Sequence, residues 1–231
     1  MTPGEATSKA FHEYCEKNCA KEFADVKVIA WHAHGPGLIH SKNPINKLED
    51  MKGLKIRGGS RVINQLLEKL GATPVGMPVP AVPESLSKGV IDATTIPWEV
   101  TPSLKVAELV KNHTGFSGKN GLYTQTFVFA MNKAAYDKMP DDLKKIIDAN
   151  SGIETAAMMG RVMDEGDKIG LAIAQKAGNN IITLDEAETQ RWKDTAAPLV
   201  EAWEAEMAGK GIDGKALVAE ARALIEKYSG N

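Results

Sequence analysis

The sequence predicts an α/β fold, and two observations support this prediction. Apolar segments rich in β-branched residues alternate with segments whose apolar residues recur at helical spacing. The connections between these segments are only a few residues long, which is typical of parallel strands covered by helices. In this central stretch we expect strands at 53–57, 74–77 and 90–96 and helices at 60–70 and 82–88.

Further elements are expected on both sides of this stretch. Strands are predicted at 26–33, 122–131 and 180–184, and helices at 5–23, 133–137, 185–208 and 214–228. The segment 102–111 is helical or mixed. The Gly- and Pro-containing segment 35–44 and the Gly- and Asn-containing segment that ends at Gly121 are expected to be loops. Pro198 is expected to kink the helix that contains it.

Residues 141–177 predict one very long helix. It opens with Pro140 and a pair of aspartates, which are favourable at a helix N-terminus. Four glycines between residues 152 and 170 interrupt it, so we expect a bend or a break. A helix of this length is unusual in a compact domain. Two explanations stay open, namely a strut between two lobes and two helices that meet at a kink.

The composition excludes several classes of protein. The chain of 231 residues is 43% hydrophobic and 25% charged, which is ordinary for a globular protein and unlike a disordered or fibrous chain. Its 28 basic and 30 acidic side chains leave a formal charge of −2, so electrostatics does not favour nucleic acid or an anionic membrane as a partner. No apolar run approaches the ~18 residues that a membrane-spanning helix needs.

The first residues and the two cysteines bear on the compartment. Residues 1–5 contain neither the basic nor the apolar segment of a signal peptide, which by itself indicates a cytoplasmic protein unless the front has been cut away. Cys15 and Cys19 lie four residues apart on one face of a predicted helix. We interpret them as two small apolar side chains, because such a pair fits ordinary disulfide geometry poorly.

The segment from Lys55 to Ser60 has the features of an anion site. A predicted strand ends in Arg57, two glycines turn the chain, and Ser60 caps the next helix. Ligands of open α/β sheets bind at the carboxyl ends of strands, and helix N-termini offer free N–H groups. An arginine at this position can hold a carboxylate through two parallel hydrogen bonds. The alternative is a solvated arginine beside a tight turn.

Two further groups of residues suggest chemistry. Trp98 follows the carboxyl end of another strand, where it either walls an apolar ligand or packs at a helix–sheet junction. His32 and His34 project from one face of a strand, a spacing that suits a metal ion, but no further cluster completes four ligands. The spacing also opens the motif of amidohydrolase barrels, which need more βα units than this chain has. No G-x-S-x-G motif is present.

Five blocks of sequence follow one another at characteristic spacing. They are DMKGLKIR at 50–57, LGATPV with a Met-Pro pair at 70–78, LSKGVID at 86–92, MNK at 131–133 and MPDDL at 139–143. Together they resemble the extracytoplasmic solute-binding proteins of TRAP transporters, the DctP family. The resemblance extends over essentially the whole chain, which corresponds to the later part of a typical family member.

The resemblance implies a periplasmic-binding-protein-like fold of two lobes, a clamshell with a long inter-lobe helix after Pro140. The first lobe would comprise residues 1–34 and 122–163. The second lobe would comprise residues 35–121 and 164–231, with the C-terminal helices. Family members begin with a signal peptide and further βα units, so the chain is interpreted as a gene fragment or a truncated chain with an incomplete first lobe. That lobe is expected to expose an unpaired strand edge or an apolar patch.

The resemblance also implies a ligand site. Arg57 matches the arginine that holds the carboxylate in the family, and residues 95–98 match a loop that lines the cleft. The remaining expected contacts are a hydroxyl from Thr95, apolar walls from Trp98, Ile96 and Phe127, amides near Ser60, and a further donor at His34.

These expectations describe a binding protein rather than an enzyme. The chain is expected to be the periplasmic solute-binding protein of a TRAP transporter, to capture an organic acid and to deliver it to membrane permease subunits. A single strong cation favours a monocarboxylate with an apolar body. We expect no cofactor, no metal and no nucleic acid, and a monomer or dimer. Two alternatives remain, a small metal-dependent hydrolase that uses His32 and His34, and a fragment without function.

Overall fold

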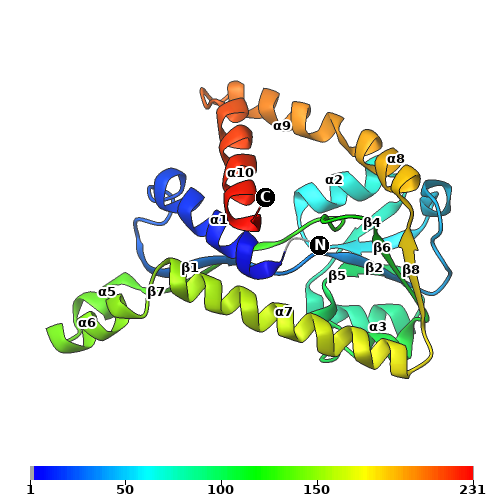
Figure 1. Ribbon diagram of the computed structural model, residues 1–231, viewed down its shortest axis with the longest axis horizontal. Coiled ribbons are helices and arrows are strands. Elements are labelled where there is room, and N and C mark those ends of the chain that lie inside the picture. The colour runs from blue at the N-terminus through cyan, green and yellow to red at the C-terminus, as the bar shows by residue number, and fades with distance from the viewer. Residues whose placement is uncertain (1–2, 231) are drawn as a thin grey trace. The chain divides into compact units, whose positions relative to one another are not determined.

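A computed structural model describes residues 3–230 (Figure 1). The chain divides into two compact units, each assembled from separate parts of the sequence. The six-stranded unit consists of residues 36–123 and 166–214. The two-stranded unit consists of residues 3–35, 124–165 and 215–230. The α/β class predicted from the sequence is therefore confirmed, and each unit has its own sheet.

The six-stranded unit has one mixed sheet with the strand order β4-β3-β5-β2-β6-β8. The strands are β2 (Leu38–Ser41), β3 (Lys55–Gly58), β4 (Thr73–Gly76), β5 (Ala93–Ile96), β6 (Asn112–Phe116) and β8 (Asn180–Leu184). The strands β4, β3 and β5 run parallel, as the alternating pattern predicts. Because β2 pairs antiparallel with both β5 and β6, the direction reverses in the middle of the sheet.

Helices cover both faces of this sheet. They are α2 (Arg61–Lys69), α3 (Val82–Ser87), α4 (Val106–Leu109) and α8 (Glu186–Ala196), with 3₁₀ turns η1 (Leu48–Met51), η2 (Val79–Ala81) and η3 (Trp98–Val100). The helix α9 (Pro198–Ala208) follows α8 in the same unit and has no buried residue. Ile56 of β3 belongs to an apolar cluster with α2 and α8, whereas Ile96 of β5 packs with α3 and α4. Figure 1 shows α2 and α3 on opposite sides of the sheet.

Local sequence accounts for the ends of several helices. The hydroxyl oxygen of Ser60 accepts a hydrogen bond from the Ile63 amide, which caps α2 as predicted. Gly71 follows the helix with a φ of 94°, a left-handed conformation that favours glycine. Pro198 divides the predicted helix 185–208 into α8 and α9, because a proline cannot donate the backbone hydrogen bond inside a helix.

The predicted loops at 35–44 and before Gly121 were wrong, because each contains a buried strand. All residues of β2 and β6 are buried, although the two strands carry His40, Ser41, Asn112 and His113. These polar side chains bond to one another or to backbone carbonyl groups inside the sheet. Short strands with polar side chains and flanking glycine or proline do not show the apolar alternation that predicts a strand.

The two-stranded unit contains β1 (Val26–Ala33) and β7 (Thr126–Asn132), paired antiparallel. Its helices are α1 (Gly4–Asn18), α5 (Lys133–Asp137), α6 (Asp141–Ala149) and most of α10 (Gly214–Ser229). On β7, three consecutive side chains, Phe127, Val128 and Phe129, are 41%, 39% and 48% exposed. The sheet has only these two strands among the described residues, and it exposes the apolar patch that was expected.

The grouping of α10 differs from the expected lobes. We expected residues 164–231 to belong with 35–121, but 215–230 group with the N-terminal residues. Within this unit, ion pairs join α10 to α1: Lys17 pairs with Glu220 at 2.8 Å, and Lys227 pairs with Glu13 at 2.7 Å.

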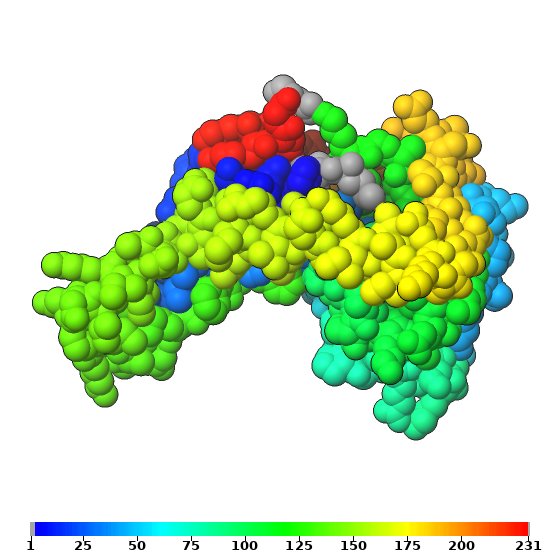
Figure 2. All heavy atoms as spheres, turned by 60° about the horizontal axis from the view of Figure 1, so that its bottom comes forward, coloured from blue at the N-terminus to red at the C-terminus, as the bar shows by residue number. Residues whose placement is uncertain are grey.

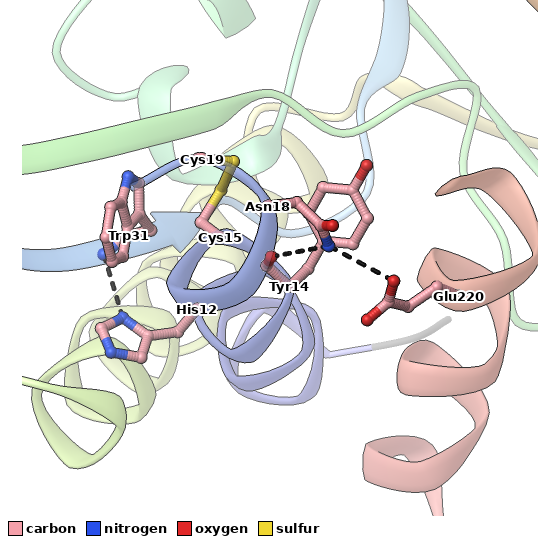
Figure 3. Close-up of a disulfide and its surroundings, with 7 residues drawn as sticks. All are labelled: His12, Tyr14, Cys15, Asn18, Cys19, Trp31 and Glu220. Atoms are coloured by element: carbon pink, nitrogen blue, oxygen red, sulfur yellow. Dashed lines mark hydrogen bonds between the residues drawn. A yellow bond between two sulfur atoms is a disulfide. The ribbon is translucent and has the colours of Figure 1, made fainter. Parts of the chain in front are cut away.

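Cys15 and Cys19 form a disulfide at the end of α1 (Figure 3). The interpretation as two free apolar side chains was therefore wrong. It assumed a helix that continues to residue 23, but α1 ends at Asn18 and Cys19 is its C-cap. The pair thus lies at a helix end with 4.5 Å between its Cα atoms, within the range of disulfides.

The predicted long helix breaks once. Its first part is α6, and α7 (Ile153–Lys176) follows Gly152, whose φ is 99°. From there α7 runs without interruption and contributes residues 153–165 to the two-stranded unit and 166–176 to the six-stranded unit. Figure 2 shows α7 as a continuous yellow-green ridge, one side of which lies on the surface in this view. No helix of residues 3–230 is long and apolar enough to cross a membrane.

The later glycines of α7 permit close packing instead of breaking the helix. A Cβ atom at Gly160 would overlap the backbone of Gly4, and one at Gly170 would overlap the carbonyl group of Trp98. Asp164 accepts hydrogen bonds from the Gly4 and Glu5 amides at the start of α1. These short-range contacts fix α7 within each unit, so its glycines serve packing and not flexibility.

Candidate anion-binding site

Arg57 lies at the carboxyl end of β3, directly before the turn into α2. Its side chain is 5% exposed, and within residues 3–230 it is the only lysine or arginine in the buried class. Burial lowers the pKa of the Arg57 guanidinium, but an arginine stays charged at every physiological pH. The six-stranded unit therefore holds one positive charge away from water.

Arg57 has backbone carbonyl groups as hydrogen-bond partners. Its Nε donates to the Met77 oxygen at 3.1 Å, and its Nη1 donates to the Thr95 oxygen at 3.3 Å. No carboxylate of the described chain pairs with it. Since a guanidinium has five N–H donors, the part that carries the two terminal nitrogens retains donors for a ligand. Both terminal nitrogens lie beside Gly59, where a Cβ atom would be 3.3 Å away from each.

Thr95 holds Arg57 through two different groups. Its hydroxyl donates to the Arg57 carbonyl oxygen at 3.1 Å, while its own carbonyl accepts from the guanidinium. The side chain is fully buried. We expected the Thr95 hydroxyl to bond the ligand, but the structure uses its proton inside the sheet. The residue therefore fixes the arginine.

Tyr123 completes this arrangement, and the sequence did not indicate it. Its hydroxyl donates to the Thr95 carbonyl oxygen at 3.0 Å, the same oxygen that accepts from Arg57. Burial raises the pKa of Tyr123 to about 12, so the phenol stays protonated and remains a donor at neutral pH.

Ile96 and Trp98, the expected apolar walls of the ligand site, are buried in the six-stranded unit. Ile96 is 2% exposed and packs against Val82 and Val106. Trp98 is 7% exposed and packs with Leu38 and other core residues. This packing agrees with the alternative that Trp98 lies at a helix–sheet junction, and its role as a ligand wall stays a prediction.

Behind Trp98 lies a pair of buried histidines. Strand register places Arg57, Thr94, His40 and His113 next to one another across four strands. The Nδ1 atoms of His40 and His113 are 2.7 Å apart, and His40 Nε2 is 3.1 Å from the Ile96 oxygen. Burial lowers the pKa of His40 to about 3 and that of His113 to about 4. Both histidines are therefore neutral, and Arg57 is the charged side chain among these four neighbouring residues.

The tautomers of the pair follow from its neighbours. The Ile96 carbonyl oxygen can only accept, so His40 Nε2 carries a proton and donates to it. Because His40 is neutral, its Nδ1 accepts and His113 Nδ1 donates to it. His113 Nε2 is then the unprotonated nitrogen, 2.9 Å from the Asn179 amide nitrogen. The pair therefore anchors the end of β5 next to Thr95.

The two-stranded unit holds the other predicted residues. Phe127 stacks on His32 with 5.2 Å between ring centroids and lies 5.9 Å from the His34 ring. His34 is buried, and its Nδ1 lies within hydrogen-bond distance of the Gly35 oxygen. Within residues 3–230, no group of three or more His, Cys, Asp or Glu side chains could hold a metal ion. His32 and His34 therefore pack against an aromatic ring.

Comparison with known proteins identifies the family. The model of the bacterial extracellular solute-binding proteins, family 7 (DctP), matches residues 4–206. The chain belongs to this family. Proteins of this family are bacterial extracellular solute-binding proteins, so the expected periplasmic location is confirmed, and the expectation of a binding protein rather than an enzyme agrees with the family. The family description gives no support to the alternative of a metal-dependent hydrolase.

Several DctP relatives have known structures or curated descriptions. A TRAP solute-binding protein from Rhodoferax ferrireducens T118, in complex with copurified benzoate, is 48% identical, with a TM-score of 0.96 over 99% of this chain and 72% of that chain. A marine metagenome TRAP solute-binding protein, in complex with 3-hydroxybenzoate, is 44% identical, with a TM-score of 0.95 over the same shares. A solute-binding protein of Albidiferax ferrireducens is 30% identical over 74% of this chain and 50% of its own length. The chain thus spans about half the length of that curated relative.

Proposed function

We propose that this DctP protein captures a monocarboxylate with an aromatic body and that Arg57 binds its carboxylate. The observation that carries the proposal is the buried guanidinium with no carboxylate partner in the described chain. Buried arginines are rarely without an ionic partner, because the loss of hydration must be offset. A ligand carboxylate would supply the missing charge and accept the donors that the sheet leaves open.

The charge balance supports one carboxylate instead of two. Arg57 is the single buried cation within residues 3–230, and the neighbouring histidine pair is neutral. A second carboxylate would meet no compensating charge in this unit. A monocarboxylate therefore suits the site better than a dicarboxylate.

The aromatic part of the proposal comes from the relatives. The two solved structures that are 48% and 44% identical contain benzoate and 3-hydroxybenzoate. Each of these ligands has one carboxylate on a benzene ring, which agrees with the single buried cation. Delivery of the ligand to TRAP permease subunits follows from family membership and belongs to the proposal.

Further predicted contacts remain part of the proposal in revised form. The amides near Ser60 lie at the N-terminus of α2, beside the turn that contacts Arg57, and can assist an anion. Phe127, with 41% of its surface exposed, and His34 stay predictions as ligand contacts. Ile96 and Trp98 also stay predictions as apolar contacts, although their side chains are buried without a ligand.

Calorimetric titration with benzoate tests the proposal. We expect Arg57→Ala to weaken binding by roughly a hundredfold, since loss of a charged, hydrogen-bonded partner costs about 3 kcal/mol. The matched control is Arg61→Ala, which removes an exposed arginine four residues away that pairs with Glu206 in the same unit. This control should bind benzoate as the parent does.

Neutral analogues separate binding from folding. Benzyl alcohol keeps the ring and lacks the charge, so the parent should bind it far more weakly than benzoate. Equal affinity for the two compounds, or unchanged benzoate binding by a folded Arg57→Ala chain, would show that Arg57 does not bind the carboxylate.

A further inference from the structure

We propose that Tyr123 is a positioning residue for the ligand-binding arginine, because its hydroxyl fixes the Thr95 carbonyl that in turn holds the Arg57 guanidinium. This inference rests on the proposed role of Arg57 as the carboxylate-binding residue. It adds a residue outside the segment from Lys55 to Ser60 in which the sequence located the anion site.

The geometry joins three residues at one oxygen atom. The Thr95 carbonyl oxygen accepts from Tyr123 Oη at 3.0 Å and from Arg57 Nη1 at 3.3 Å. A carbonyl oxygen has two lone pairs, so both bonds can form together. Without the phenol, the Thr95 carbonyl oxygen would accept from Arg57 but no longer from Tyr123. The carbonyl group would then be less firmly oriented, and so would the guanidinium that donates to it.

The position of the phenol is itself determined by packing. A Cβ atom at Gly37 would lie 2.8 Å from Tyr123 Cζ and closer still to two other ring carbons, so the ring rests directly on this glycine. Backbone hydrogen bonds also join the two segments. The Gly37 amide donates to the Tyr123 carbonyl oxygen at 2.8 Å, and the Leu122 amide donates to the Gly37 carbonyl oxygen at 3.0 Å. The hydroxyl is thereby aimed at Thr95 before any ligand arrives.

A positioning role predicts an effect that a general packing role does not. Tyr123→Phe removes the hydroxyl and keeps the ring on Gly37. We expect hydrogen exchange of the Arg57 Nε–H, followed by ¹⁵N NMR without ligand, to become at least tenfold faster, because the guanidinium is held less firmly. We expect the benzoate Kd of the same variant to rise about tenfold, the effect of one hydrogen bond.

Two further variants control the experiment. Tyr136→Phe removes an exposed phenol that bonds Asp148 at 2.8 Å in the other unit, and it should change neither readout. Gly37→Ala displaces the Tyr123 ring without touching Arg57, and it should accelerate the same Nε–H exchange. If exchange in Tyr123→Phe equals that of the parent, or if exchange rises while the benzoate Kd is unchanged, the positioning role is refuted. Failure of the parent itself to bind benzoate would instead refute the proposed function, and the ligand-free exchange would still decide whether Tyr123 holds Arg57.

Discussion

Gly170 of α7 offers the sharpest test of how this fold is packed. In a helix, Gly→Ala is ordinarily stabilising by about 1 kcal/mol, because alanine has the higher helix propensity. Here the added Cβ would overlap the Trp98 carbonyl oxygen and lie 2.8 Å from its carbon and 2.9 Å from Thr101 Oγ1. The higher helix propensity of alanine would raise the free energy of unfolding, whereas the overlap would lower it. The sign of the measured change therefore shows which effect is larger.

The structure sets the expected magnitude for Gly170→Ala. The Trp98 oxygen accepts from the Thr101 amide at 3.0 Å and from the Thr101 hydroxyl at 2.7 Å, and both bonds must distort if the turn moves away. Overpacking of a core costs about 1–3 kcal/mol, and each weakened buried hydrogen bond adds about 1 kcal/mol. After the gain in propensity, we expect a net loss of about 3 kcal/mol, or roughly 5–10 °C in Tm for a chain of this size.

Thermal unfolding followed by circular dichroism provides the assay. Gly166→Ala should destabilise less, because its Cβ would meet the Glu99 side chain at 2.8 Å and not a backbone carbonyl. Val162→Ala, at a site that is 67% exposed on the same helix, should stay within about 0.5 kcal/mol of the parent. A Gly170→Ala chain with a Tm equal to or above that of the parent would show that α7 does not pack this closely on η3.

Two further predictions concern pH and redox state. His40 and His113 have pKa values of about 3 and about 4 in the folded chain, below the ordinary 6.5, so the unfolded chain binds more protons and stability falls as the pH decreases from about 6.5. At pH 5 each should cost about 2 kcal/mol relative to pH 7.5 in urea titrations, and a constant unfolding midpoint over this range would contradict the buried neutral pair. For the Cys15–Cys19 disulfide, thiol titration should find no free thiol before reduction and two afterwards. Closure of so short a loop stabilises by only about 2 kcal/mol, so a reduced chain that unfolds entirely at 25 °C would contradict that estimate.

The sequence predicted the elements that are determined by residues close together in the chain. The strands β1 and β8 begin and end where expected, since β-branched runs bounded by turn residues are strong signals. Arg57 could be found because it combines a strand end, a turn and a helix cap within six residues. The strands β2 and β6 could not, because their buried polar residues are stabilised only by partners distant in sequence, such as Asn179 for His113.

The same distinction applies to the candidate site. Trp98 follows the end of β5, and its burial depends on residues far along the chain, such as Ala174, which local sequence could not indicate. The contribution of Tyr123 was invisible for the same reason. Its hydroxyl reaches Thr95 across 28 residues of sequence, and no spacing rule relates the two.

The uncharged strand β7 has a practical consequence for work in solution. The segment TFVFAMN carries no charged side chain, and its exposed Phe127, Val128 and Phe129 point alternately to both faces of a sheet that has two strands within residues 3–230. Such a strand is a template on which a second chain can add, and nothing in its sequence opposes that addition. We therefore expect self-association to increase with concentration, and titrations are best made in the low-micromolar range with light scattering alongside.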